Sequence, residues 1–342
     1  MRRIIGFALA FAGLVWAADL AACTTAIVRA GASASGRPMI WKQRDAEERN
    51  NYVKHFQGPR YAFTGIVDMG REDQVWDGAN EAGFLIANNL SYNLRPDSLA
   101  GRKMRAGVVM KEALGRCRTV DEFEDYLKEM PEPRYVTANF AVADAEGGAA
   151  YFETWDYGYT RYDVPENGIL YRTNYSVSGF SGKGKGYGRM DLMNYLTSLH
   201  GPTGYTPEWF LRIGRIVPIA RPTTVSSVVL EGGTEPVLWA AVGYTPACYA
   251  VPVWVAAGAE IPAFLGEGSS ANALAVALKK SEPFDFQSRI IPSVQKAERK
   301  EMRCGERLDE RFRSRGFDAD ALRKYNREAE RRFARFQKIM QP

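Results

Sequence analysis

A short apolar run ends directly at Cys23, and a segment with the alternating pattern of a β-strand begins at the next residue. Arg2 and Arg3 precede this run and small residues end it at Ala22, which is the pattern of a secretory signal peptide. The run is shorter than the roughly 20 apolar residues that a membrane-spanning helix requires. We therefore expect residues 1–22 to be a signal peptide and the mature chain to have no transmembrane segment.

Cys23 has two alternative fates in such an exported chain, whether periplasmic or secreted. Leu20, Ala21 and Ala22 fit the lipobox of bacterial lipoproteins, which predicts a lipid on Cys23 and a membrane-tethered protein. A cut before Cys23 without lipidation leaves a thiol and a free α-amine on one residue, and an amine with a pKa of about 8 is a usable base near neutral pH. Because lipid would block the thiol, the two fates exclude each other.

Composition argues against several other classes of protein. The formal net charge is only +5, and basic and acidic residues alternate, so the sequence lacks the basic stripe of a nucleic-acid-binding protein. The only histidines, His55 and His200, leave little material for a Ser-His-Asp triad or a His-based metal site. We expect no nucleic acid, no metal and no cofactor, and the sequence leaves a homo-oligomer open.

The order of predicted elements is that of an α+β protein. Short apolar runs from Thr24 to about Asn89 predict strands, and two helices are predicted over 104–116 and 120–130. Further strands follow in "VTANFAVADAEGGAAYFETW", "GILYRTNYS" and "PVLWAAVGYTPACYAVPVWV". The last 50 residues predict two amphipathic helices that are interrupted near Gly316.

Three local signals fix ends of these elements. Thr119 with Glu122 three residues later predicts a capping box at the start of the second helix. Thr206 is a plausible cap of a later helix, and the segment 145–148 predicts a turn between two strands.

Five segments resemble, in their order, the motifs of N-terminal-nucleophile (Ntn) linear-amide hydrolases: "CTTAIV", "WKQRD", "NEAGFLIANNLSYNL", "NFAVADAEGGAAYFE" and "YRTNYS". That superfamily includes choloylglycine (bile salt) hydrolases, penicillin V acylases, acid-ceramidase-like enzymes and isopenicillin N acyltransferase-like peptidases, and the sequence is most similar to the last branch. The resemblance extends from Cys23 to about Trp254. It implies a four-layer αββα sandwich in residues 23–292, with residues 293–342 as a helical C-terminal extension.

The resemblance also implies catalytic residues. The family usually carries its catalytic arginine in an "RNxD" segment, whereas "WKQRD" has Lys42 at that position and keeps Asp45. Lys42 and Arg44 are therefore alternative cations, and the two residue types are not interchangeable. We favour Lys42 near the thiol of Cys23 and Asp45 hydrogen-bonded to the α-amine.

Four further residues complete this set by the same resemblance. Asn88 aligns with the asparagine that stabilises the oxyanion, and Asn89 is the alternative one residue on. Asn174 in "RTN" resembles a second asparagine of the family, and Arg189 in "GYGRMD" resembles an arginine that organises the site. Loss of one oxyanion donor typically costs about 10²- to 10³-fold in rate.

These residues predict an exported cysteine hydrolase that cleaves a linear, non-peptide amide of a small N-acyl substrate. A Cys23 thioester would form, with the α-amine of Cys23 as base. Acyl transfer to an amine through the same thioester is the neighbouring alternative. The competing class is a non-catalytic envelope lipoprotein that is lipidated on Cys23 and binds a ligand.

The remaining cysteines allow at most one intramolecular disulfide. Cys117 ends the first predicted helix and Cys304 lies in the first C-terminal helix, so a bridge between them would fasten the C-terminal extension to the body of the protein. Cys248 would then be a buried free thiol. Three ordinary buried cysteines are the alternative.

Overall fold

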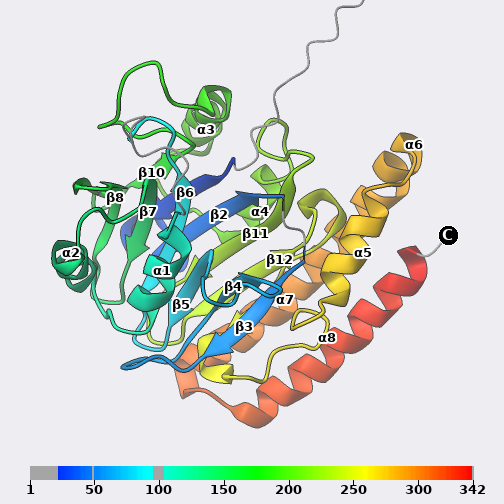
Figure 1. Cartoon of the computed structure of the whole chain (residues 1–342). Helices are drawn as coiled ribbons and strands as arrows, with labels where there is room; N and C mark the ends of the chain where they lie inside the picture. The colour runs from blue at the N-terminus through cyan, green and yellow to red at the C-terminus, as the bar shows by residue number, and fades with distance from the viewer. Residues whose placement is uncertain (1–21, 48–49, 95–103, 341–342) are drawn as a thin grey trace, which may run out of the picture.

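Two antiparallel sheets form the centre of the protein (Figure 1). The computed structural model describes residues 22–47, 50–94 and 104–340, so all but the last residue of the expected signal peptide lies outside the described residues. The first sheet has the order β10-β1-β2-β11-β12-β13. Its strands are β1 (Thr24–Val28), β2 (Met39–Asp45), β10 (Ile169–Arg172), β11 (Thr224–Glu231), β12 (Val237–Val242) and β13 (Val251–Trp254).

The second sheet is a meander in which each strand pairs with the next one along the chain. Its strands are β3 (Asn51–Phe56), β4 (Phe63–Asp68), β5 (Asp77–Asn80), β6 (Leu85–Leu90), β7 (Ala138–Ala143), β8 (Ala149–Trp155) and β9 (Gly158–Asp163). The turn between β7 and β8 is the predicted one, and the Asp144 carboxylate closes it by accepting from the amides of Glu146 and Gly148. Local pairing thus builds one sheet, and distant segments build the other.

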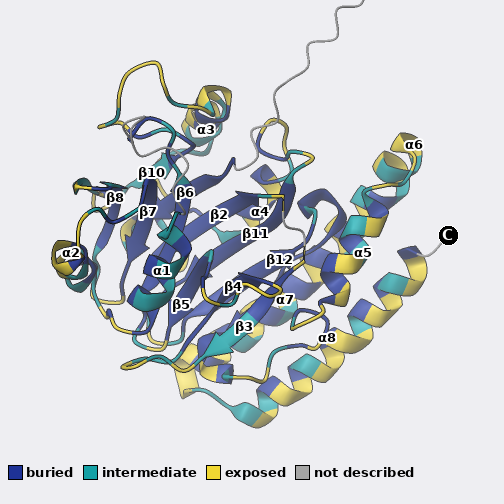
Figure 2. Cartoon of the chain, viewed as in Figure 1, coloured by how far each residue is buried: buried dark blue, intermediate teal, exposed yellow. Residues whose placement is uncertain are grey.

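Helices cover the outer face of each sheet, as Figures 1 and 2 show. On the second sheet these are α1 (Ala106–Leu114) and α2 (Val120–Glu129). The helices around the first sheet are α3 (Tyr187–His200), α4 (Pro207–Ile213), α5 (Ser270–Leu278), α6 (Pro283–Asp285), a π-helical segment (Phe286–Ile290), α7 (Ile291–Arg315) and α8 (Ala319–Met340). The expected αββα sandwich with C-terminal helices is therefore confirmed.

Predicted end signals account for several helix boundaries. Thr119 accepts a hydrogen bond from the Glu122 amide at 3.1 Å, and Glu122 accepts in return from the Arg118 amide at 2.5 Å, one residue earlier than in a standard capping box. Thr206 caps α4 by accepting from the amide of Trp209. The break between α7 and α8 begins at Gly316, whose φ of 83° favours glycine.

Apolar side chains form two cores. The larger one fills the space between the sheets and extends under the helices of the first sheet, and the smaller one lies between the second sheet and α1 and α2. The C-terminal helices belong to the larger core through residues such as Phe312 and Phe333. Burying each such side chain stabilises the fold by about 1.5–3 kcal/mol, so α7 and α8 are integral to the sandwich.

The expected disulfide between Cys117 and Cys304 is wrong. All four cysteines at described positions are free thiols. Cys117 is buried in the small core beside α1 and α2, whereas Cys304 lies on α7 and packs against the large core. The two residues belong to opposite outer layers, which rules out the Cα separation of about 4.4–6.8 Å that a disulfide requires. Cys248 is the expected buried thiol, although it lies between β12 and β13, outside both strands.

No described helix combines the length and the apolar character that crossing a membrane requires.

Candidate active site

Cys23 stands immediately before β1, an interior strand of the first sheet that lies next to the edge strand β10. Strand β1 pairs with β2 on one side and with β10 on the other, so that Thr25 lies opposite both Lys42 and Arg172. Cys23 is 8% exposed, and its Sγ lies 3.9 Å from the backbone oxygen of Asp45. Neighbouring strands thus hold the cysteine on a rigid element, as a nucleophile requires.

Asn174 and Arg189 together bind the backbone of Cys23. The nitrogen of Cys23 donates to Asn174 Oδ1 at 2.9 Å, and Arg189 donates through Nη1 to the oxygen of Cys23. Arg189 also donates to Thr24 Oγ1 at 2.9 Å and to Asn174 Oδ1 at 2.5 Å. In this uncut chain the Cys23 nitrogen is a peptide amide, and it occupies the position that the α-amine would take after cleavage. The structure therefore brings Asn174 and Arg189 into direct contact with Cys23.

Asp45 lies beside Cys23 without a hydrogen bond to its nitrogen, which is bonded to Asn174 instead. One oxygen of Asp45 accepts from Thr224 Oγ1 at 2.6 Å, and Oδ2 is buried with no partner among the described residues. Burial raises the pKa of Asp45 to about 7, although the Thr224 hydroxyl and the charge of Arg189 oppose this shift. The expected bond from Asp45 to a free α-amine concerns the cut chain and stays a prediction.

Lys42 and Arg44 have different surroundings although both point from β2 toward the second sheet. Lys42 is 1% exposed and donates to the backbone oxygen of Trp76 at 2.6 Å and to Asn88 Oδ1 at 2.8 Å. Arg44 forms a buried bidentate ion pair with Asp68 at 2.8 and 2.7 Å. Arg44 is therefore committed to Asp68, whereas Lys42 contacts a predicted site residue.

Burial and the neighbouring charged groups, including Cys23, act in opposite directions on the pKa of Lys42. Burial lowers the pKa of Lys42, while Cys23 and the carboxylates of Asp77 and Asp68 raise it. Lys42 is thus a buried cation whose charge interacts with Cys23.

Asn88 and Asn89 have different hydrogen-bond partners. Asn88 accepts from Lys42, and its Nδ2 has no acceptor within the described part of the chain. Asn89 accepts from Thr25 Oγ1 at 2.7 Å and donates through Nδ2 to the backbone oxygen of Thr173. Of the two amides, Asn88 thus has the unused donor that an oxyanion needs, and Asn89 fastens the segment before Asn174.

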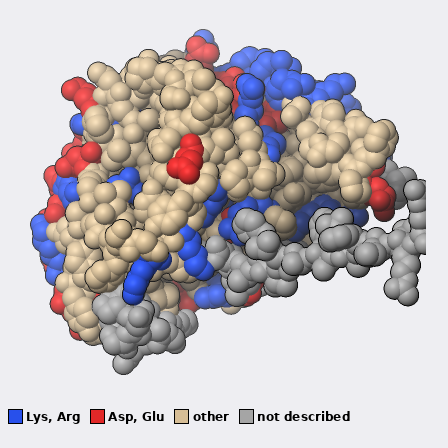
Figure 3. Space-filling view, turned by 90° about the horizontal axis from the view of Figure 1, so that it is seen from above, with Lys and Arg blue, Asp and Glu red and all other residues tan. Residues whose placement is uncertain are grey.

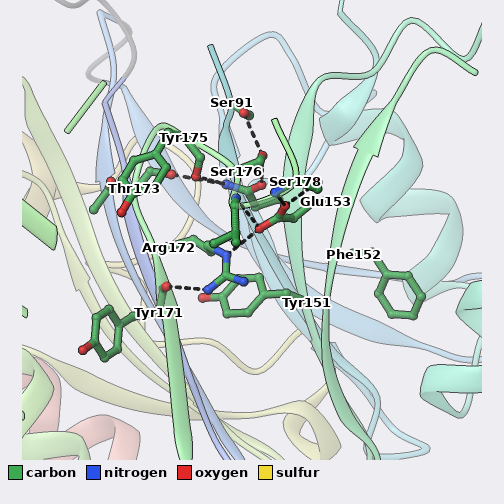
Figure 4. A network of polar contacts seen from close by, with 12 residues as sticks. Ser91, Tyr151, Phe152, Glu153, Tyr171, Arg172, Thr173, Tyr175, Ser176 and Ser178 are labelled. Atoms are coloured by element: carbon green, nitrogen blue, oxygen red, sulfur yellow. Dashed lines mark hydrogen bonds and ion pairs between the residues drawn. The ribbon is translucent and has the colours of Figure 1, made fainter. Parts of the chain in front are cut away.

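A buried network positions the loop that carries Asn174 (Figure 4). Glu153 forms an ion pair with Arg172 at 2.7 Å and accepts from the amides of Val177 and Ser178 at 2.9 and 2.7 Å. The Arg172 guanidinium lies over the ring of Tyr151 at 5.0 Å. The loop is thereby held from the side of β8.

Amide side chains hold the opposite side of the same loop. Asn93 accepts from the amide of Ser176 at 2.8 Å and donates to its carbonyl at 2.9 Å. Asn139 donates to the backbone oxygen of Tyr175 at 3.1 Å, and the hydroxyls of Ser91 and Ser176 are 2.8 Å apart. Sequence reasoning gave none of these residues a role, although the quoted motifs contain Glu153, Asn93 and Asn139.

Gly186 explains the glycine-rich segment before α3. It precedes the helix with a φ of 86°, and an added Cβ would lie 2.5 Å from Arg189 Nη2 and 2.9 Å from Thr173 Oγ1. Glycine therefore allows Arg189 to reach Cys23 from the first turn of α3.

Asp77 is a further acidic residue that the sequence did not single out. Its side chain is fully buried in β5, and neither carboxylate oxygen has a hydrogen-bond partner among the described residues. Burial raises its pKa to about 6 against the opposing charges of Lys42 and Arg44. The sequence offered no signal for it, because Asp77 begins the short strand "DGAN", which lacks an apolar alternation.

Figure 3 shows the face seen from the top of Figure 1, the end at which β1 begins. Wide neutral areas separate its charges, and Lys and Arg gather most densely along one edge. Among the described residues, no group of three or more His, Cys, Asp or Glu could hold a metal ion.

Comparison with known families gives one match. Residues 41–190 match the model of the acyl-coenzyme A:6-aminopenicillanic acid acyl-transferase family. The match includes Lys42, Asp45, Asn88, Asn174 and Arg189. No curated protein sequence matches the chain.

Several solved structures are similar to this one at low sequence identity. An N-acylethanolamine-hydrolyzing acid amidase ortholog from Caenorhabditis elegans has a TM-score of 0.48 at 16% identity, covering 61% of this chain and 92% of that chain. Penicillin V acylase from Agrobacterium tumefaciens has a TM-score of 0.44 at 14% identity, covering 67% and 86%. A mutant of conjugated bile acid hydrolase from Clostridium perfringens has a TM-score of 0.41 at 12% identity, covering 64% and 89%. Nothing about activity follows from these scores.

Proposed function

We propose that the chain is an amide-cleaving enzyme of the Ntn-hydrolase superfamily. The match of residues 41–190 to the acyl-transferase family and the two-sheet sandwich support this proposal. It is an exported cysteine hydrolase that acts on a linear, non-peptide N-acyl amide. Cys23 is its nucleophile once residues 1–22 have been removed. The lipidated, membrane-tethered alternative would leave Cys23 unable to react.

The observation that carries this proposal is the contact of Asn174 and Arg189 with both backbone polar atoms of Cys23. A lipid anchor needs no such contacts, because an anchor acts through a flexible tether. A nucleophile needs them, because its reactivity depends on a fixed position. The buried polar network around Asn174 supports the same interpretation, since its fixed geometry keeps Asn174 at Cys23.

In the proposed reaction the α-amine of Cys23 takes the thiol proton, and the sulfur attacks the carbonyl carbon of the substrate amide. Asn88 Nδ2 donates to the oxyanion, held in place by its bond to Lys42. The carbon–nitrogen bond then breaks, and the leaving amine takes the proton from the α-amine. Water attacks the resulting thioester, which releases the carboxylic acid and restores the thiol. Neither step needs a cofactor.

Acyl transfer is a second candidate function. The family match supports it, because the matched family is named for an acyl-transferase. The thioester is common to both routes. An amine in place of water in the second step gives a new amide. Product analysis with and without an added amine separates the two routes.

The test is a panel of N-acyl amino acids, phenoxyacetyl amides and conjugated bile acids with the purified protein. Release of amine by the wild type and its loss in Cys23→Ala are expected. Cys304→Ala is the matched control, because Cys304 is a half-buried thiol on α7 that the proposed reaction does not use. Equal turnover by Cys23→Ala and the wild type would overturn the proposal.

A further inference from the structure

Asp77 is a buried acid with no hydrogen-bond partner among the described residues and no part in the reaction above. Its side chain is 0% exposed, and both oxygens lack partners there. Leaving an ionised carboxylate in such a place is costly unless a cation compensates for it. The neighbours of Asp77 therefore decide its role.

Two cations lower the pKa of Asp77, and one of them is already paired with another carboxylate. The groups that act on Asp77 are Lys42 and Arg44. Arg44 is bound through both guanidinium arms to Asp68. Lys42 has no carboxylate within 4.0 Å among the described residues, and it donates to the carbonyl of Trp76, the residue that precedes Asp77. Lys42 is thus the cation left to balance Asp77.

The same lysine connects Asp77 to the nucleophile. The charged and titratable groups that act on Lys42 are Cys23, Asp77, Arg44 and Asp68. Because Arg44 and Asp68 neutralise each other, Asp77 and Cys23 are the groups that oppose the effect of burial on the pKa of Lys42. Burial favours the neutral amine, and an ionised Asp77 favours the ammonium.

We propose that Asp77 is the counter-ion of Lys42 and a positioning residue that sets the pH range in which Cys23 reacts. An ionised Asp77 keeps Lys42 protonated beside the thiol. Lys42 in turn stabilises the thiolate and holds Asn88 by its amide oxygen. This inference deepens the proposed function and rests on Cys23 as the nucleophile.

The pKa of about 6 gives this role a specific pH signature. Above pH 6 the wild-type carboxylate is charged and Asp77→Asn is not, so the two proteins differ. Below pH 6 the wild-type carboxyl is protonated and resembles the asparagine amide, so the two proteins converge. A purely structural role of Asp77 would instead give an offset at every pH.

The experiment measures the rate at which iodoacetamide alkylates Cys23, the thiolate displacing iodide, as a function of pH. The full-length gene is expressed, the N-terminus of the purified protein is established by its intact mass, and the Cys23 peptide is quantified by mass spectrometry. Between about pH 6 and pH 8, where a thiol of ordinary pKa (about 8.5) is mostly protonated, Asp77→Asn should react about tenfold more slowly, the equivalent of one pKa unit of charge interaction. Below pH 6 the rates should agree.

Three further variants make the result specific. Asp77→Glu should keep the wild-type profile, because it keeps the charge. In a Lys42→Met background, Asp77→Asn should have no additional effect. Asp309→Asn removes a buried acid on α7 and should leave Cys23 alkylation unchanged. If Asp77→Asn is not recovered folded, Asp77→Ala replaces it.

Coincident profiles of wild type and Asp77→Asn at all pH values would overturn the inference, and so would an offset that persists below pH 6. Alkylation needs no substrate, so its outcome is independent of the amide panel. A pH-dependent difference without amide cleavage would retain the Asp77 role and reject the proposed function. Amide cleavage together with coincident alkylation profiles would retain the proposed function and reject the Asp77 role.

Discussion

Two regions of strand β2 differ in how their buried charges are compensated: Arg44 is fully paired, whereas Lys42 and Asp45 near Cys23 are not. Facing the second sheet, Arg44 has a direct ion pair with Asp68, whereas Lys42 donates within hydrogen-bond distance only to neutral oxygens of described residues. Facing the helices, Asp45 accepts from the Thr224 hydroxyl and has one unpartnered oxygen. The charges around Cys23 are thus incompletely neutralised, while the nearby structural charge is fully paired. This difference separates a charge pair that supports the fold from the residues that we propose for the chemistry.

Arg44→Met gives the largest expected change, because it leaves Asp68 buried without its partner. Breaking a buried ion pair from one side typically destabilises a protein by about 3–5 kcal/mol. Chemical denaturation measures the free energy of unfolding. Arg118→Met is the control, since the ion pair of Arg118 with Glu146 is exposed and its loss should change stability little. Equal stability of the two variants would remove the distinction.

Lys42→Met should instead lower activity with the fold intact. Without the ammonium, Asn88 loses the bond that fixes its amide, and we expect kcat to fall by about 10²-fold, the size of effect seen on loss of an oxyanion donor. Stability should fall less than in Arg44→Met, because Asp77, whose pKa burial already raises to about 6, can take up a proton once its counter-ion is gone. Amide-cleavage kinetics and denaturation on the same sample check both parts. A stability loss as large as that of Arg44→Met would contradict the comparison.

Asp45→Asn should change how stability depends on pH. Burial raises the pKa of Asp45 to about 7, from an unfolded value of about 3.9. The folded protein therefore holds the proton more tightly, so this contribution to stability is complete below pH 4 and is lost as pH rises through 7. At pH 8 the variant should be more stable than the wild type by at least about 1.4 kcal/mol, the equivalent of one pKa unit.

Thermal or chemical unfolding at pH 4 and pH 8 tests the Asp45 prediction. The two proteins should agree at pH 4, where the Asp45 carboxyl is protonated. Asp77 contributes a decline of the same sign around pH 6 in both proteins and so cancels in the difference. A difference at pH 4 equal to that at pH 8 would show that the effect is not one of titration.

Local patterns in the sequence predicted much of the fold. The start of β1, the capping box at Thr119, the turn after Asp144 and the break at Gly316 each depend on a few consecutive residues. Strand β11 was missed, because "TVSSVVLE" is buried on both faces and its serines disturb the apolar alternation. Ser227 accepts from the Trp41 indole in the interior, a contact that periodicity does not encode.

Contacts between residues that are distant in the sequence could not be predicted at the site. The role of Arg189 was inferred from a resemblance. Its contact with Cys23 depends on how α3 approaches the first sheet. The proposed role of Asp77 needs the stacking of the two sheets, which brings Lys42 to the carbonyl of the residue before Asp77. The false disulfide between Cys117 and Cys304 came from ignoring which layer each helix joins. These features depend on tertiary packing, for which a short motif carries no signal.

The most direct test of the central claim is a mass measurement on protein quenched during turnover of a slow N-acyl amide. We predict a peptide that begins at Cys23, with a free α-amine and the mass of the substrate acyl group on its thiol. Hydroxylamine should remove that mass, because a thioester is labile to it. A lipid on Cys23, or an acyl group found only on another residue, would contradict the account.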